Sequence, residues 1–168
     1  MKKELPVRKK IRLKGNDYAS PGYYFITICC KDREKLLWIN KPDVGAIINR
    51  PQVELSKYGQ ITENAIHEIE KHYRRVTVDK YVIMPNHVHM ILIIHSDKDG
   101  RLIIASTNDN ISIVVQQLKQ QISKQIGLAI WQKSYHDHII RGEYDYQKIW
   151  NYIDVNPMQW EKDCFFIE

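Results

Sequence analysis

Residues 76–94 read VTVDKYVIMPNHVHMILII, and this stretch decides the fold. Two runs rich in β-branched and apolar residues, 76–84 and 87–94, flank the turn-forming dipeptide Pro85-Asn86 and predict two successive strands. Side chains alternate along a strand. One face of the second strand is therefore apolar, with Val88, Met90, Leu92 and Ile94. The opposite face carries His87, His89, Ile91 and Ile93. The apolar face suits a core beneath helices.

Further elements are predicted on both sides of these two strands. Residues 23–30 are rich in aromatic and β-branched residues and predict a strand after the turn signal at 20–22. From Thr62 the spacing is helical, with the apolar stripe Ala65, Ile66, Ile69 and Tyr73. The other predictions are a short strand at 36–39, loops at 41–55 and 96–108, a helix at 111–126, an extended segment at 134–141 and a helix from 143 to about 156.

The helix at 111–126 has the clearest boundaries. Asp109 or Asn110 is expected to cap its start and Gly127 its end. Its expected core stripe is Ile111, Val114, Val115, Leu118 and Ile122. The final helix should end near Asn156, because Pro157 disfavours helical geometry in the residue before it.

The order strand, helix, strand, strand, helix, strand, helix predicts an α+β fold. Its first six elements match the ferredoxin-like (RRM-like) arrangement, in which helices cover one face of an antiparallel sheet. The other face is then expected to be free for a ligand, with the last helix as an addition.

Composition favours one domain spanning residues 1–168. The chain is 43% hydrophobic and 27% charged, which is typical neither of a disordered chain nor of a membrane protein. The longest apolar stretch, 88–94, is too short to cross a bilayer, and no secretion leader is expected. Three cysteines without a CxxC pair favour a reduced compartment, so a cytoplasmic, nucleoid-associated protein is expected.

Positive charge is concentrated at the start of the chain. Seven of the first fourteen residues are basic and one is acidic, although the whole chain carries only +5. Residues 1–15 are therefore interpreted as a basic arm on a folded body at 16–168. Such an arm either contacts a phosphate backbone or serves as a solvated tail.

Two His-x-His pairs are candidate metal ligands. His87 and His89 share one strand face, so both imidazoles can reach one divalent ion. His136 and His138 form a second pair, so either pair could bind a metal, or both could join in one four-histidine zinc site. Alternatively, the histidines are ordinary strand-end residues. The central residue of the second pair is the charged Asp137, which places its strand nearer the sheet edge.

The last helix supplies a candidate nucleophile. Tyr152 and Asn156 are four residues apart and so lie on one helical face. A phenol attacks poorly until a nearby cation favours the phenolate or a base takes its proton. The alternative is an ordinary tyrosine, one of ten in the chain.

Four segments decide between these alternatives. Residues 81–90, YVIMPNHVHM, resemble the histidine-hydrophobe-histidine (HUH) segment of REP-associated tyrosine transposases, within the single-tyrosine transposases of insertion sequences. Three further segments are similar to the same family: NDY at 16–18 with PGYYFITIC at 21–29, WQ at 131–132 with YHDHIIR at 135–141, and YIDVNP at 152–157. These segments occur in family order over nearly the whole chain.

The resemblance implies a metal-dependent enzyme that cleaves and rejoins single-stranded DNA. His87 and His89 match the metal-binding histidines, Tyr152 the nucleophile, and Asn156 a third ligand. The cofactor would be Mg²⁺ or Mn²⁺, and the product a 5′-phosphotyrosine with a free 3′-hydroxyl. His138 matches a histidine that supports the site or contacts DNA.

The implied partners are DNA hairpins from palindromic repeats, with a homodimer as a possible state. The expected DNA contacts are Arg8, Lys9, Lys10, Arg12, Lys119, Lys124, His138 and Arg141. Lys119 and Lys124 are expected one face away from the core stripe of their helix. No DNA-binding extension of the kind found in longer relatives is expected after Trp160.

Two other functions fit the residues. One is a non-catalytic module that stacks unpaired bases on Tyr23 or Phe25. The other is a zinc hydrolase or structural zinc protein that uses both histidine pairs.

Overall fold

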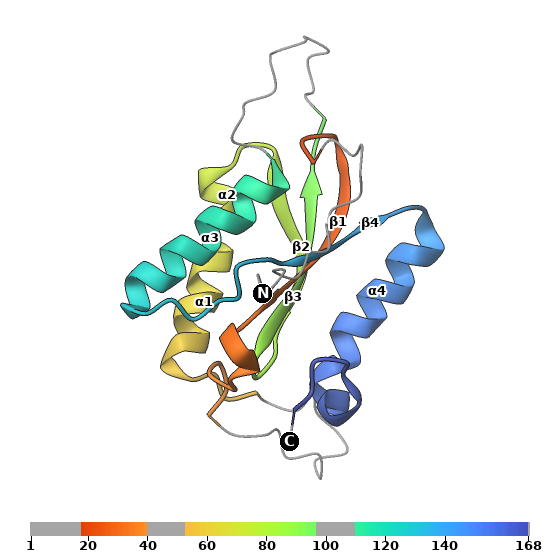
Figure 1. Cartoon of the computed structure of the whole chain (residues 1–168). Helices are drawn as coiled ribbons and strands as arrows, with labels where there is room; N and C mark the ends of the chain where they lie inside the picture. Colours follow the sequence, from red (N-terminus) through yellow and green to blue (C-terminus); the bar gives the residue numbers. More distant parts are fainter. Residues whose placement is uncertain (1–17, 40–52, 97–109, 168) are drawn as a thin grey trace, which may run out of the picture.

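The computed structural model describes residues 18–39, 53–96 and 110–167. Four strands form one antiparallel sheet in the order β2-β3-β1-β4 (Figure 1). Their bounds are Gly22–Cys29 (β1), Val76–Ile83 (β2), His87–Ile94 (β3) and His136–Ile140 (β4). The predicted α+β, ferredoxin-like architecture is confirmed.

The register of the sheet places one residue each of β3, β1 and β4 in the same row. Thr27 of β1 lies opposite His89 of β3 on one side and His136 of β4 on the other. Strand β4 is at an edge, as its central Asp137 predicted, and β3 is internal. The other edge, β2, has a register shift between Val78 and Lys80.

Helices α1 (Lys57–His67), α2 (Ile69–His72) and α3 (Ile111–Ile126) cover one face of the sheet (Figure 1). Helix α1 begins five residues before Thr62, because the Ser56 side chain caps it by accepting a hydrogen bond from the backbone N–H of Gly59. Helix α3 has the predicted bounds, with Asn110 as N-cap and Gly127 in the left-handed conformation (φ 82°) at its end. The five residues of its predicted stripe are buried.

Helix α4 (Glu143–Val155) lies against the opposite face and continues into the 3-10 segment η2 (Asn156–Lys162). A small apolar cluster joins this helix to the sheet, and it consists of Ile91, Ile140, Ile149 and Ile153. The expectation that this face is free was wrong, because the apolar stripe of α4 is buried against it.

The other predicted elements are only partly tested. The strand predicted at 36–39 is reduced to one bridge between Trp38 and Leu55, and helix α1 follows. Most of the predicted loops, and the basic arm with Arg8, Lys9, Lys10 and Arg12, lie outside the described residues. Among the residues that are described, no helix has both the length and the apolar character needed to cross a membrane.

Candidate active site

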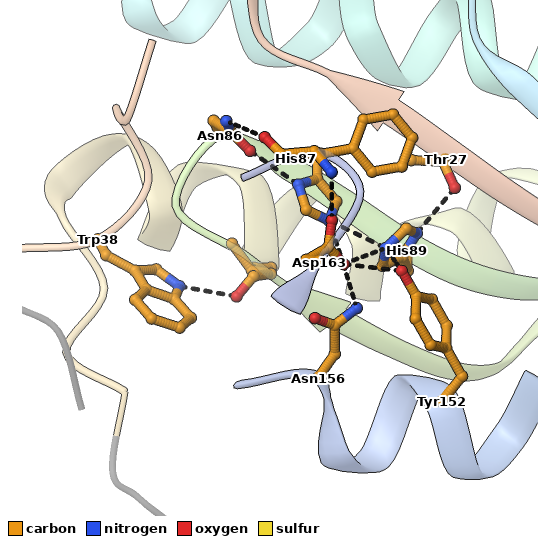
Figure 2. Close-up of polar contacts among 10 residues, drawn as sticks. Thr27, Trp38, Asn86, His87, His89, Tyr152, Asn156 and Asp163 are labelled. Carbon is orange, nitrogen blue, oxygen red and sulfur yellow. Dashed lines mark hydrogen bonds and ion pairs between the residues drawn. The ribbon is translucent and has the colours of Figure 1, made fainter. Parts of the chain in front are cut away.

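The site begins with two buried imidazoles on the α4 side of β3. His87 and His89 are 0% and 1% exposed, and their Nε2 atoms are 2.9 Å apart (Figure 2). Strand alternation directs both rings to this face, while Val88 and Met90 point into the core beneath α1 and α3. The shared orientation predicted from the sequence is confirmed.

An aspartate that sequence reasoning missed completes the cluster. Asp163 follows η2, and its Oδ2 lies 3.9 Å from His87 Nε2 and 3.7 Å from His89 Nε2. The ligand atoms of these three residues all lie within 4.8 Å of one another. No periodicity or motif distinguishes Asp163 in the sequence. The turn of the chain after η2 brings it into the site.

Helix α4 directs Tyr152 and Asn156 into the same cluster (Figure 2). The Tyr152 hydroxyl donates a hydrogen bond to Asp163 Oδ2 (2.7 Å) and lies 3.2 Å from His89 Nε2. Asn156, one turn later, donates from Nδ2 to the same Oδ2 (2.7 Å). The predicted helical face is confirmed, and in this arrangement Asn156 supports Asp163.

Two further polar side chains contact the Nδ1 atoms of the histidines. His87 Nδ1 lies 2.8 Å from Asn86 Oδ1, and His89 Nδ1 lies 2.7 Å from Thr27 Oγ1. Asn86 and Thr27 are themselves buried. Such partners orient the ring of a metal-binding histidine.

Burial and charge set the protonation of the cluster. Burial, followed by the proximity of His89, lowers the pKa of His87 well below 6.5, and burial also lowers the pKa of His89. Burial opposes ionisation of Asp163, but hydrogen bonds from His89, the Phe165 N–H and Tyr152 outweigh it, so the pKa of Asp163 falls below its usual range. Neutral imidazoles beside a carboxylate are ready to bind a cation.

The pKa of Tyr152 is raised, first by burial and then by its hydrogen bond to the charged Asp163. The phenol therefore keeps its proton in this arrangement. A positive charge in the cluster would offset Asp163 and favour the phenolate.

The donor set fits a divalent metal ion. Two imidazole nitrogens and one carboxylate oxygen converge, and this mixed set suits several divalent metals. The cluster does not include the second histidine pair. His138 is instead paired with Asp145 (2.8 Å), and His136 is exposed, with its ring 5.5 Å from that of Phe165. Within the described residues, therefore, the two pairs do not form the four-histidine zinc site.

The cationic residues predicted to contact DNA have different surroundings. Lys119 is buried in α3, where Nζ donates to the carbonyls of Gln132 (2.7 Å) and Ser134 (2.8 Å), and burial lowers its pKa to about 8. Its predicted exposed position was wrong, because the segment before β4 passes over the helix. Lys124 is exposed on α3, on the helix-covered side of the sheet, and Arg141 is exposed between β4 and α4.

The aromatic rings of Tyr23 and Phe25 in β1 pack against other side chains of the protein. The Phe25 ring stacks on His89 with centroids 5.3 Å apart, and Tyr23, which is 43% exposed, contacts Tyr146 edge-on. Phe25 thus contributes to the site and is not a free platform for a base.

The chain matches a family model and several known proteins. The family model described as "Transposase IS200 like" matches residues 18–156. An uncharacterized protein of Haemophilus influenzae is 33% identical over 177 residues, covering 96% of this chain and 94% of its own length.

More distant matches include REP-associated tyrosine transposases. The REP-associated tyrosine transposase of Escherichia coli is 25% identical over 143 residues, covering 84% of this chain and 70% of its own length. A solved structure of a REP-associated tyrosine transposase bound to a REP hairpin shares the fold, with a TM-score of 0.60 and 23% identity over 83% of this chain and 68% of that one. The family match spans both the histidine pair and the tyrosine helix, and this chain belongs to the IS200-like transposase family.

Proposed function

We propose that this protein cleaves and rejoins single-stranded DNA through a covalent bond to Tyr152. One observation carries the proposal: the Tyr152 hydroxyl lies 3.2 Å from His89 Nε2, beside the His87, His89 and Asp163 cluster. A nucleophile and a metal-binding group thus meet in one buried site, although they come from α4, β3 and the segment after η2.

In the proposed step, the Tyr152 oxygen attacks the scissile phosphorus in line. A P–O bond to tyrosine forms as the P–O3′ bond breaks, leaving a 5′-phosphotyrosine. The phenol, which donates a hydrogen bond to Asp163 Oδ2 at 2.7 Å, releases its proton to water as the new bond forms, and the leaving O3′ takes up a proton from water. Attack by another 3′-hydroxyl reverses the chemistry and rejoins the DNA without ATP.

His87 and His89 would hold a Mg²⁺ or Mn²⁺ ion with Asp163 as the third ligand. Such an ion would polarise the phosphate and offset charge that develops on it. Asn156, predicted as the third ligand, hydrogen-bonds Asp163 and would fix its carboxylate. Its own coordination of metal stays a prediction.

We propose DNA hairpins from palindromic repeats as the substrate. The support is the solved relative, which is bound to a REP hairpin. Arg8, Lys9, Lys10 and Arg12 remain proposed phosphate contacts, as do the exposed Lys124 and Arg141. His138 stays a proposed DNA contact, and Lys119 is withdrawn because its ammonium group is buried. Each phosphate contact should steepen the salt dependence of binding by about 0.7–0.9 log units per tenfold change in salt.

The test is formation of a DNA–protein adduct. The protein is incubated with labelled single-stranded hairpins in Mg²⁺ or Mn²⁺, or in EDTA, and the products are separated on a denaturing protein gel. We expect a metal-dependent adduct that disappears in Tyr152→Phe. Tyr144→Phe is the matched control, because Tyr144 lies on the same helix and is 83% exposed. Tight hairpin binding without any adduct would support the non-catalytic module instead.

A further inference from the structure

His87 and His89 differ in the hydrogen bond that each makes through Nδ1. The orientation of the Asn86 side-chain amide shows which atom donates in the bond to His87. Asn86 Nδ2 donates to the carbonyl oxygens of Arg33 (3.2 Å) and Phe165 (3.0 Å). Carbonyl oxygens only accept hydrogen bonds, so the amide nitrogen must face them. The amide oxygen therefore faces His87 Nδ1 at 2.8 Å.

This contact determines the tautomer of His87. An amide oxygen cannot donate, so the hydrogen of the contact must belong to His87 Nδ1. The neutral ring then has a lone pair on Nε2, which is the atom that faces His89 and Asp163. His87 is therefore already in the form that binds a metal through Nε2.

The contacts of His89 favour the opposite tautomer for this ring. Its Nε2 faces the lone pair of His87 Nε2 at 2.9 Å and the Tyr152 oxygen at 3.2 Å. Tyr152 uses its own hydrogen to bond Asp163. Because both neighbours of His89 Nε2 offer lone pairs, this nitrogen carries the hydrogen. His89 Nδ1 then accepts a hydrogen bond from the Thr27 hydroxyl at 2.7 Å.

We infer that Thr27 permits metal loading by reversing its hydrogen bond to His89. When a metal takes His89 Nε2, the proton must move to Nδ1, and the Thr27 hydroxyl must turn from donor to acceptor. A hydroxyl can do both, since it has one hydrogen and two lone pairs. His87 needs no such change. The inference rests on the proposed metal site and makes Thr27 a positioning residue.

The surroundings favour a rotation of the hydroxyl alone. Thr27 is 3% exposed, and its backbone is paired directly with that of His89 across β1 and β3. The distance between the two side chains is thus fixed by the sheet. Valine in this place can neither donate nor accept, whereas serine can do both.

The tautomers can be measured directly by ¹⁵N–¹H correlation spectra of the imidazoles. In the metal-free protein we expect a proton on Nδ1 of His87 and on Nε2 of His89. Saturation with diamagnetic Zn²⁺ should move the His89 proton to Nδ1 and leave that of His87 in place. A metal-free His89 protonated at Nδ1, or a zinc-bound His89 still protonated at Nε2, would overturn the inference.

Calorimetric titration with Mn²⁺ tests the role of Thr27. We expect Thr27→Val to weaken binding about 10- to 100-fold, and Thr27→Ser to stay within about threefold of the parent. Thr77→Val is the matched control, because Thr77 Oγ1 lies 2.8 Å from His95 Nε2 on the same sheet but outside the site. Thermal unfolding confirms that each variant is folded.

The outcomes separate the inference from the proposed function. Unchanged Mn²⁺ affinity in folded Thr27→Val would overturn the role of Thr27 while the metal site stands. A parent protein that binds neither Mn²⁺ nor Zn²⁺ would overturn the proposed metal site and the loading step together. The metal-free spectra would still decide the two tautomers.

Discussion

The face of the sheet under α1 and α3 and the face under α4 are both buried, but they bury different chemistry. The first is packed mainly with aliphatic and aromatic side chains, including Ile26, Met90 and Leu92. The second has a small apolar cluster beside a polar group centred on His87, His89 and Asp163. Strand β3 contributes to both faces through successive residues.

Burial on the first face stabilises the fold, whereas burial on the second face encloses the polar groups of the proposed site. Aliphatic side chains gain free energy when they leave water. Burying imidazoles and a carboxylate costs free energy unless these groups are paired. The apolar core on the other side of the sheet offsets that cost. Changes to the two faces should therefore have separable effects.

Loss of the Asp163 charge should give the largest effect on the polar face. Asp163→Asn removes a carboxylate that faces both Nε2 atoms. We expect Mn²⁺ affinity to fall by at least about 10- to 100-fold, and adduct formation to fall with it. Calorimetry and the adduct gel measure the two effects.

Asp154→Asn is the matched control for this change, because Asp154 is also on the α4 side but pairs with Lys80. It should leave Mn²⁺ affinity unchanged. Parent-like Mn²⁺ binding in Asp163→Asn would remove Asp163 from the proposed ligand set.

Truncation on the apolar face should lower stability and leave the chemistry intact. Leu92 is fully buried, so Leu92→Ala should lower the free energy of unfolding by about 2–5 kcal/mol. Chemical denaturation measures this loss. Adduct yield per folded molecule should match the parent below the unfolding transition.

Leu128→Ala provides the exposed counterpart, since Leu128 is 59% exposed, and its effect should stay within about 0.5 kcal/mol. If Leu92→Ala abolished the adduct in folded protein, the two faces would not be separable.

Lys119 is a polar exception within the helix-covered face, and its loss should lower stability less than Leu92→Ala does. Lys119→Met keeps the length of the side chain but leaves the carbonyls of Gln132 and Ser134 without these hydrogen bonds. We expect the free energy of unfolding to fall by about 1–3 kcal/mol, measured by denaturation. Lys124→Met, on the exposed side of α3, should be neutral for stability. A stability equal to the parent in Lys119→Met would show that the buried ammonium contributes nothing.

Local patterns were sufficient to predict much of the site. Alternation along 87–94 placed His87 and His89 on one face, and the four-residue spacing placed Tyr152 and Asn156 on one side of their helix. Capping residues and the apolar stripe predicted the bounds of α3. These signals were readable because each depends on neighbours within one strand or a few helical turns.

The sequence by itself determined the order of the elements, the directions of the histidines and tyrosine, and the resemblance to the transposase family. Only the tertiary structure decided that α4 covers the second face, that Asp163 enters the cluster, and that Lys119 is buried. These features depend on contacts between segments that are far apart in the chain, and no local sequence pattern predicts such contacts. Asp163 meets the histidines across more than seventy residues of chain, and the burial of Lys119 depends on carbonyls 13 and 15 residues away.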